Sequence, residues 1–133
     1  MKHCTVGFVL DRQSVLLLKK EKPPEHQGML NGIGGKIEPA ETPLACIRRE
    51  CRKETGLHIV EDRWYLIERG FIFGGGDLFI YAAICPAGQK VTKGDTGRAR
   101  WYPIMALPKR VVSDVPRLTH IAVRQARSMK RER

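Results

Sequence analysis

Two glutamates four residues apart, Glu50 and Glu54, are the side chains of this sequence best suited to chemistry. On a helix this spacing puts both carboxylates on one face. Like charges held so close repel each other, and a divalent cation between them removes that repulsion. Mg²⁺ prefers one or two carboxylates together with water and phosphate oxygens of a substrate. The pair therefore predicts a magnesium site, with the alternative that both glutamates pair with Arg48, Arg49 or Lys53 on a solvated helix face.

The sequence predicts a helix over residues 42–56 that would carry this pair. Thr42 suits the N-cap, Pro43 suits the first helical position, and Gly56 can supply a left-handed stop. An apolar stripe recurs at helical spacing through Leu44, Ile47 and Cys51. Both glutamates lie at the border of this stripe, so we expect their carboxylates to be half-sheltered where the helix meets the rest of the fold.

The remaining elements must bring further groups to that helix. Strands are predicted over residues 4–10, 15–19, 64–73, 78–85 and 99–104, with a hairpin at 74–77 and a second amphipathic helix over Val115–Arg131. The glycine-dense residues 32–38 indicate a backbone that something approaches closely. Strands mixed with two helices favour an α+β fold.

Counted from Gly35, the fixed positions are Gly35, Glu41, Arg49, Glu50, Cys51, Lys53, Glu54, Gly56 and Leu57. This pattern resembles the Nudix box of the Nudix hydrolases, with one departure: Lys53 stands where the first glutamate of a Glu-Glu pair is expected. The resemblance implies an α/β/α sandwich with a mixed β-sheet, as a single domain over residues 1–133. It also implies hydrolysis of a nucleoside diphosphate linked to another group, assisted by Mg²⁺ or Mn²⁺.

The resemblance also implies a role for each matching residue. Glu50 and Glu54 would be metal ligands, and Glu50 would also orient or deprotonate the attacking water. The carbonyl of Gly35 would add a ligand. Lys36 would contact phosphate, and Arg49 would clamp a glutamate through a bidentate ion pair. The structural members of the motif would be Glu41 and Gly56.

Asp95 is a further candidate metal ligand. It stands six residues before Trp101, where the bacterial MutT proteins of the family carry an acidic residue that reaches the metal. The alternative is an ordinary turn residue.

Lys53 leaves three outcomes open. The site could work with fewer cations, it could be a nucleotide-binding module with weakened catalysis, or the lysine could be an engineered substitution. An ammonium in place of a carboxylate changes the charge beside the cations by two units, and like charges near 4 Å repel by about 4 kcal/mol at an effective dielectric of 20. The working hypothesis is an active hydrolase with fewer metal ions.

The segment from Leu30 to Lys36 resembles the Trp-Asn-Gly-Phe-Gly-Gly-Lys segment of animal oxidised-purine nucleoside triphosphatases. Asn31 would then read the base, because an amide offers both a donor and an acceptor. Asp114 is a second base-binding candidate, against a helix-capping role. We therefore predict a MutT-like pyrophosphohydrolase, with 8-oxo-dGTP as a candidate substrate. Three aromatics could stack on the base, although core packing is the favoured role of each: Phe73, Phe79 and Trp101.

The 133 residues carry 24 Lys and Arg against 14 Asp and Glu, a formal net charge of +10. Such a field favours nucleotides and nucleic acids. The basic C-terminal residues Arg124, Arg127, Lys130, Arg131 and Arg133 suggest an alternative, an RNA-binding or RNA 5′-end-processing protein. It is not favoured, because this stretch has no aromatic side chains for base stacking.

Composition and segment lengths exclude several other classes of protein. With 42% hydrophobic and 29% charged residues, the chain is neither collagenous nor disordered. Its apolar runs are too short to span a bilayer, and no apolar stretch of a signal peptide follows Met1. We therefore expect a cytoplasmic protein that does not bind membranes, with reduced cysteines. The oligomeric state is left open.

Overall fold

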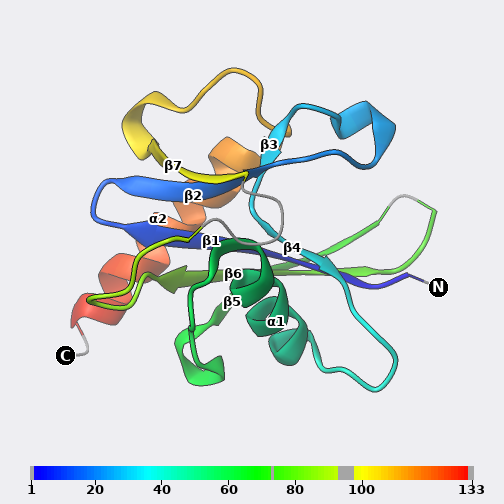
Figure 1. Cartoon of the computed structure of the whole chain (residues 1–133), viewed down its shortest axis with the longest axis horizontal. Helices are drawn as coiled ribbons and strands as arrows, with labels where there is room; N and C mark the ends of the chain where they lie inside the picture. The colour runs from blue at the N-terminus through cyan, green and yellow to red at the C-terminus, as the bar shows by residue number, and fades with distance from the viewer. Residues whose placement is uncertain (1, 73, 93–97, 132–133) are drawn as a thin grey trace.

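The computed structural model describes residues 2–72, 74–92 and 98–131 of the chain. In this part of the chain one sheet and two α-helices make up the fold (Figure 1). The strands are β1 (Cys4–Asp11), β2 (Ser14–Lys19), β3 (Leu30–Asn31), β4 (Ile33–Lys36), β5 (Tyr65–Phe71), β6 (Asp77–Ile84) and β7 (Ala99–Pro103). The helices are α1 (Pro43–Thr55) and α2 (Val115–Arg131), with short 3-10 turns at Pro24–His26, Glu61–Arg63 and Ile104–Ala106.

The sheet is mixed, as predicted, and β1 lies at its centre. β1 runs parallel to β6 and antiparallel to β2 and β4. β4 pairs with the first half of β1, and β2 pairs with the second half along the same edge. β3 and β7 extend the sheet beyond β2, and β5 extends it beyond β6. The glycine-dense residues 32–38 therefore include the strand β4, which lies directly against β1.

The two helices cover opposite faces of the sheet, so the α/β/α sandwich is confirmed. Alternate residues of one strand face opposite sides, and β1 sends Val9 to the α1 side and Phe8 to the α2 side. The core on the α1 side also includes Leu16, Ile33, Ile47, Cys51, Leu57 and Trp64. The core on the α2 side also includes Leu10, Val15, Leu17, Leu118 and Ala122. The central strands β1 and β2 therefore have a hydrophobic core on each of their two faces.

Helix α1 begins and ends where the sequence predicted. The hydroxyl of Thr42 accepts a hydrogen bond from the Ala45 N–H at 3.1 Å, and Pro43 is the first helical residue. Gly56 adopts a left-handed conformation with φ 80°, and its N–H donates to the carbonyl of Arg52 at 2.9 Å. Both ends of the helix are therefore fixed by local capping.

Other boundaries differ slightly from the prediction. β5 starts at Tyr65 rather than Trp64, because the Trp64 indole N–H donates to the Ile59 carbonyl at 3.1 Å and its ring is buried in the core. The predicted hairpin is present, with the Ile72 N–H donating to the Gly76 carbonyl at 3.0 Å. Neither α-helix in the described ranges has the length and hydrophobicity needed to cross a membrane.

Candidate active site

Helix α1 turns Glu50 and Glu54 toward the sheet. Each residue is only 8% exposed. The expectation of half-sheltered carboxylates was therefore wrong in degree: both are buried. The reason is β4, which packs against this face of α1 and whose position cannot be read from the helix itself.

The backbone of β4 touches both carboxylates. The Gly34 N–H donates a hydrogen bond to Oε1 of Glu54 at 3.2 Å. A side chain at Gly35 would place its Cβ 2.8 Å from the carboxyl carbon of Glu50, closer than such atoms approach. Glycine at this position is thus what lets the strand lie against the glutamate.

The hydrogen-bond pattern between β1 and β4 determines the direction in which the backbone groups of Gly34 and Gly35 point. Bonded and non-bonded pairs alternate along an antiparallel ladder, and the Ile37 N–H donates to the His3 carbonyl at 2.8 Å. Gly35 lies opposite Thr5, in a bonded pair, so its backbone groups face β1. Gly34 turns its backbone groups the other way, where Glu54 lies. The Cys46 Sγ on α1 still reaches the carbonyl of Gly35 at 3.7 Å, and the assignment of this carbonyl as a metal ligand stays a prediction.

Arg49 ties the loop before α1 to the site. Its Nε and Nη2 donate to the two carboxylate oxygens of Glu41 at 2.7 and 3.0 Å, and its Nη1 donates to Glu50 at 2.8 Å. Its Nη2 also reaches the carbonyl of Lys36 at 3.1 Å. These hydrogen bonds lower the pKa of Glu41 and raise that of Arg49. Glu41 also accepts from the Glu38 N–H at 3.0 Å, so it braces this loop.

Burial raises the pKa of Glu54 to about 7, and the nearby charge of Glu50 adds to the rise. The charges of Lys20 and Lys53 and the hydrogen bond from Gly34 oppose it. A carboxyl with such a pKa is half-protonated near neutral pH, and a bound cation would favour its ionised form.

The donor set fits a divalent cation that keeps much of its shell for water and substrate. Two buried carboxylates that repel each other lie against the glycines of β4. Within the described ranges, no three His, Cys, Asp or Glu side chains gather closely enough to hold a metal ion. This is the donor set expected for Mg²⁺, which takes few protein ligands. Asp95, the further predicted ligand, lies outside the described residues.

The two lysines of the motif are both exposed. Lys36 ends β4, next to the glycines that contact Glu50 and Glu54. Lys53 lies on the exposed flank of α1, close enough for its charge to lower the pKa of Glu54. Lys53 is thus on the same helix as the carboxylate pair, and Lys36 is on the strand that packs against it.

The predicted base-reading residues come from segments that meet at β3. The Oδ1 of Asn31 accepts from the Gly32 N–H at 2.7 Å, and its amide nitrogen has no hydrogen bond to any residue that the structure describes, so this donor could serve a ligand. Val112 donates its N–H to the Leu30 carbonyl at 2.9 Å, which brings the segment before α2 beside β3. Asp114 directly precedes α2, is exposed, and lies 3.6 Å from Arg117. Its place before the first helical turn matches the capping alternative.

Sequence reasoning missed Lys20, whose charge acts on Glu54. Alternation along β2 could have found it, because Leu16 faces α1 and residues two and four positions later share that face. Of the three candidate aromatics for stacking, Phe79 and Trp101 pack partly buried against the core on the α1 side. Phe73 lies outside the described residues.

Comparison with known proteins finds relatives of one family. The family model described as NUDIX domain matches residues 1–120. The NAD-capped RNA hydrolase NudC of Vibrio vulnificus is 28% identical over 106 residues, which cover 79% of this chain and 40% of NudC. The uncharacterized Nudix hydrolase YvcI of Bacillus subtilis is 30% identical over 97 residues, 68% of this chain and 58% of YvcI. The human 8-oxo-dGDP phosphatase NUDT18 is 28% identical over 111 residues, 80% of this chain and 33% of NUDT18. The chain therefore spans at most 58% of the length of these three relatives.

Solved structures share the fold. A MutT/nudix family protein from Enterococcus faecalis superposes with a TM-score of 0.77 at 15% identity, over 96% of this chain and 62% of that one. A MutT structure described for Aliivibrio salmonicida and Vibrio cholerae gives a TM-score of 0.68 at 18% identity, over 92% of this chain and 98% of that one. At such identities the likeness concerns the arrangement of strands and helices.

Proposed function

The chain belongs to the NUDIX domain family, and on that premise we propose that it hydrolyses a nucleoside diphosphate linked to another group, with Mg²⁺ or Mn²⁺ as cofactor. The observation that carries this proposal is the buried pair Glu50 and Glu54, held against the glycines of β4. Two carboxylates buried beside each other without a cation are costly to keep ionised. A fold that keeps them there is suited to binding one.

Each residue of the site has a part in the reaction. A bound divalent cation would neutralise charge on the diphosphate oxygens and position water. Glu50 and Glu54 would hold that cation together with a glycine carbonyl of β4, and Glu50 would take the proton of the attacking water. Water adds to one phosphorus, the bond from that phosphorus to the bridging oxygen breaks, and two phosphate products leave. Arg49 keeps Glu50 in place through their 2.8 Å contact, and Lys36 binds a phosphate oxygen.

Lys53 fits a site that works with few cations. Its ammonium occupies the flank of α1 where another carboxylate would bind a further ion, and it can itself contact a phosphate. The contrary case is a module that binds nucleotides without turning them over.

The finer proposal for the substrate is a nucleoside triphosphate, hydrolysed to the monophosphate and pyrophosphate, with 8-oxo-dGTP as the first candidate. The free amide nitrogen of Asn31 supports it, since a purine edge offers acceptors to such a donor. A relative of this chain bears the name 8-oxo-dGDP phosphatase. A second candidate, the 5′ end of RNA, is suggested by the name NAD-capped RNA hydrolase of another relative and by the net charge of +10.

A panel of nucleoside triphosphates, nucleotide sugars and capped RNA with Mg²⁺ or Mn²⁺, scored for released phosphate or pyrophosphate, tests the function. We expect turnover that Glu50→Gln and Glu54→Gln reduce at least 100-fold, since each removes a charged ligand. Arg124→Gln, on the exposed face of α2, is the control and leaves the rate unchanged.

Lys53→Glu separates the two readings of the site. If the unsubstituted chain hydrolyses nothing in the panel while Lys53→Glu gains metal-dependent hydrolysis, the chain is a nucleotide-binding module and the proposed activity is wrong. If Lys53→Glu is no faster than the unsubstituted chain, the lysine belongs to a working site.

A further inference from the structure

Strand β5 forms a free edge of the sheet. In the described part of the chain it pairs with β6 on one side and with no strand on the other. A free edge presents unpaired N–H and C=O groups that can pair with a strand of another molecule. Native proteins guard such edges with proline, with unpaired charges or with a β-bulge. The presence or absence of these guards therefore decides whether β5 is open to pairing.

β5 has few of these guards. It contains no proline, and its bulge lies between Leu66 and Glu68, so the second half of the strand is regular. Its two charged side chains are held by partners of the same chain. Glu68 accepts two hydrogen bonds from Arg117, at 2.7 and 2.9 Å, and Arg69 lies 3.6 Å from Asp77. The charge along this edge is thus balanced locally, although the whole chain carries a net charge of +10.

Exposed apolar side chains lie on the same strand. Phe71 is 86% exposed, and Leu66 is 50% exposed. Phe71 lies two residues after Arg69 and therefore on the same face of the strand. The guanidinium of Arg69 lies over the ring of Phe79, 4.8 Å from its centre. An exposed aromatic ring beside an unpaired backbone edge favours contact with another strand.

The hydrogen bonds with β6 determine which backbone groups of β5 point outward. The Ile72 N–H donates to the Gly76 carbonyl at 3.0 Å, so these two residues form a hydrogen-bonded pair. Bonded and non-bonded pairs alternate between antiparallel strands. Phe71 and Arg69 are therefore in non-bonded pairs with β6, and their N–H and C=O groups point to the free edge. The backbone groups of Gly70, between them, point to β6.

We propose that two copies of this chain form a symmetric dimer by pairing their β5 strands antiparallel, with Gly70 of one copy opposite Gly70 of the second copy. Arg69 then lies opposite Phe71 of the second copy. The outward N–H and C=O groups of these two residues bond in both copies, and the two sheets become continuous. The inference does not depend on the proposed activity.

Charge selects this register among the symmetric ones. A centre at Glu68 would place two carboxylates directly opposite each other, and a centre at Arg69 would do the same with two guanidiniums; both arrangements are destabilising. A centre at Gly70 avoids both, and it puts Arg69 against the ring of Phe71, which suits a cation–π contact. A centre at Phe71 would put the outward groups of Arg69 beyond the end of the other strand, which stops at Phe71.

Sedimentation velocity over protein concentrations from about 5 to about 500 μM tests the association, because dimerisation follows mass action. A buffer with 200 mM NaCl screens the net charge. The mass should rise with concentration from that of one chain, 15.1 kDa, toward that of two. Phe71→Ser should weaken the dimer about 10-fold or more, because it removes the apolar contact and the cation–π partner of Arg69.

The matched control removes an equally exposed apolar side chain elsewhere. Met105 is 91% exposed and lies on the 3-10 turn after β7. Met105→Ser should leave the dimer affinity within about 2-fold. The inference is overturned if the chain stays monomeric over the whole range, if it grows beyond the dimer, or if Met105→Ser weakens association as much as Phe71→Ser does.

A disulfide cross-link tests the register. Opposite residues of a non-bonded antiparallel pair have Cα atoms about 4.5 Å apart, a separation that a disulfide spans. An added Cβ at Gly70 would meet no atom within 4 Å. The tests use a Cys4→Ser background, because Cys4 is partly exposed and the other three cysteines are buried. Oxidation by diamide should then link two copies of Gly70→Cys.

Leu66→Cys is the control for the cross-link, because in this register the two copies of residue 66 lie at opposite ends of the paired strands. It should form no disulfide between copies. A protein that dimerises but is linked through Leu66→Cys, or is not linked through Gly70→Cys, overturns the proposed pairing.

The pairing leaves the active site open. β1 and β6 lie between β5 and β4, the strand that contacts Glu50 and Glu54. Turnover per chain should therefore be the same in Phe71→Ser as in the unsubstituted chain. A loss of turnover in Phe71→Ser that follows its loss of dimer would show that the two copies meet at the active site, and would overturn the pairing through β5.

Discussion

Glu54 shows how single residues set the properties of this site. Burial and the charge of Glu50 raise its pKa, and Lys20, Lys53 and the Gly34 N–H lower it again, to about 7. The glutamate is therefore sensitive to pH near neutrality in the metal-free protein. Of these influences, Glu50 and Lys53 were visible in the spacing along one helix. Lys20 and Gly34 come from other segments, so the helix sequence could not reveal them.

The raised pKa of Glu54 predicts a loss of stability as pH rises. The folded protein binds this proton more tightly than the unfolded chain, whose carboxyl has its ordinary pKa near 4.5. The protonated form contributes stability below pH 4.5 that is lost as pH rises to about 7, and the curve then flattens. In EDTA, the free energy of unfolding by urea should therefore fall between pH 5 and pH 8 by on the order of 2 kcal/mol more than in Glu54→Gln.

The comparison with Glu54→Gln isolates this group, because all other titrating residues are shared. Parallel pH curves for the two proteins would show that Glu54 has an ordinary pKa. Saturating Mg²⁺ should shrink the difference, since the cation stabilises the ionised carboxylate.

Two buried threonines, one on each helix, differ in the hydrogen bonds of their hydroxyls and should therefore differ in their effect on stability. The hydroxyl of Thr119 on α2 has no hydrogen-bond partner among the described residues, and the residue is 1% exposed. The hydroxyl of Thr55 on α1 donates to the Cys51 carbonyl at 2.6 Å and accepts from the Leu57 N–H at 3.1 Å. Thr119→Val should stabilise the protein by about 1 kcal/mol, whereas Thr55→Val should destabilise it by about 1–3 kcal/mol. Urea unfolding measures the change in the free energy of unfolding for both variants. If the two changes had the same sign, the assignment of hydrogen bonds would be contradicted.

Among the elements, the contact of β4 with α1 determines the shape of the site. The ends of α1 were predictable because Thr42, Pro43 and Gly56 act locally. The depth at which Glu50 is buried was not, because it depends on Gly35, which reaches the helix only after β4 has paired with β1. The glycine-dense sequence indicated a close approach without naming the partner. The partners are the β1 backbone on one side and a carboxylate on the other.

Two glycine-to-alanine variants test this contact. At Gly35 the added Cβ would lie 2.8 Å from the Glu50 carboxyl carbon, while at Gly70 in β5 it would meet nothing within 4 Å. Gly35→Ala should displace the carboxylate and weaken Mn²⁺ binding about 10-fold or more, with the fold retained by circular dichroism. Gly70→Ala should bind Mn²⁺ as the unsubstituted chain does. Calorimetric titration measures the Mn²⁺ affinity of both variants. An unchanged affinity in Gly35→Ala would show that β4 can move away from Glu50 without disturbing the site.

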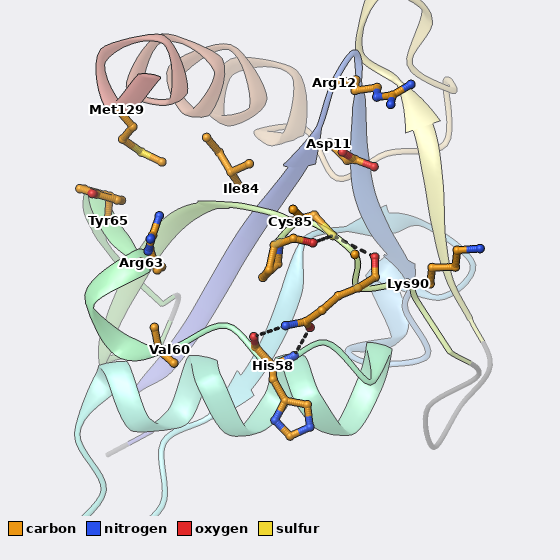
Figure 2. A pocket seen from close by; sticks show the side chains of 14 residues that line it. Asp11, Arg12, His58, Val60, Arg63, Tyr65, Ile84, Cys85, Lys90 and Met129 are labelled. Atoms are coloured by element: carbon orange, nitrogen blue, oxygen red, sulfur yellow. Dashed lines mark hydrogen bonds between the residues drawn. The ribbon is translucent and has the colours of Figure 1, made fainter. Parts of the chain in front are cut away.

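Over the whole molecule, the sequence gives the size of the positive charge but not where on the surface that charge lies. The net charge of +10 is readable from the chain, but its distribution is not. The sequence pointed to the C-terminal helix as the basic surface. The structure shows exposed cations on α1 as well, and also around a pocket between the β1–β2 turn, the segment before β5 and the end of α2 (Figure 2). These cations come from segments far apart in the sequence. Only pairing of the strands brings Arg12, Arg63 and Lys90 to one place.

Such a charge excess should oppose folding at low salt. Raising NaCl from 20 to 200 mM screens the repulsion and should increase the free energy of unfolding by about 1 kcal/mol at pH 7. Near pH 9.9, the isoelectric point of the sequence, the same step should have little effect. Urea unfolding at both pH values measures this increase in the free energy of unfolding. An equal increase at both pH values would mean that the salt acts by exclusion from the protein surface and not by screening charge.

The central place of β1 has a consequence for how the chain is made. Its partner β6 lies roughly 70 residues further along, with Cys4 opposite Leu78. A ribosome adds about 5–20 residues per second, so β1 emerges several seconds before the strand that completes its second edge. During that interval Phe8 and Val9 cannot be buried in a complete core. A nascent chain with these side chains exposed is expected to bind chaperones. Synthesis that stalls between Phe71 and Asp77 should therefore leave an aggregation-prone intermediate on the ribosome.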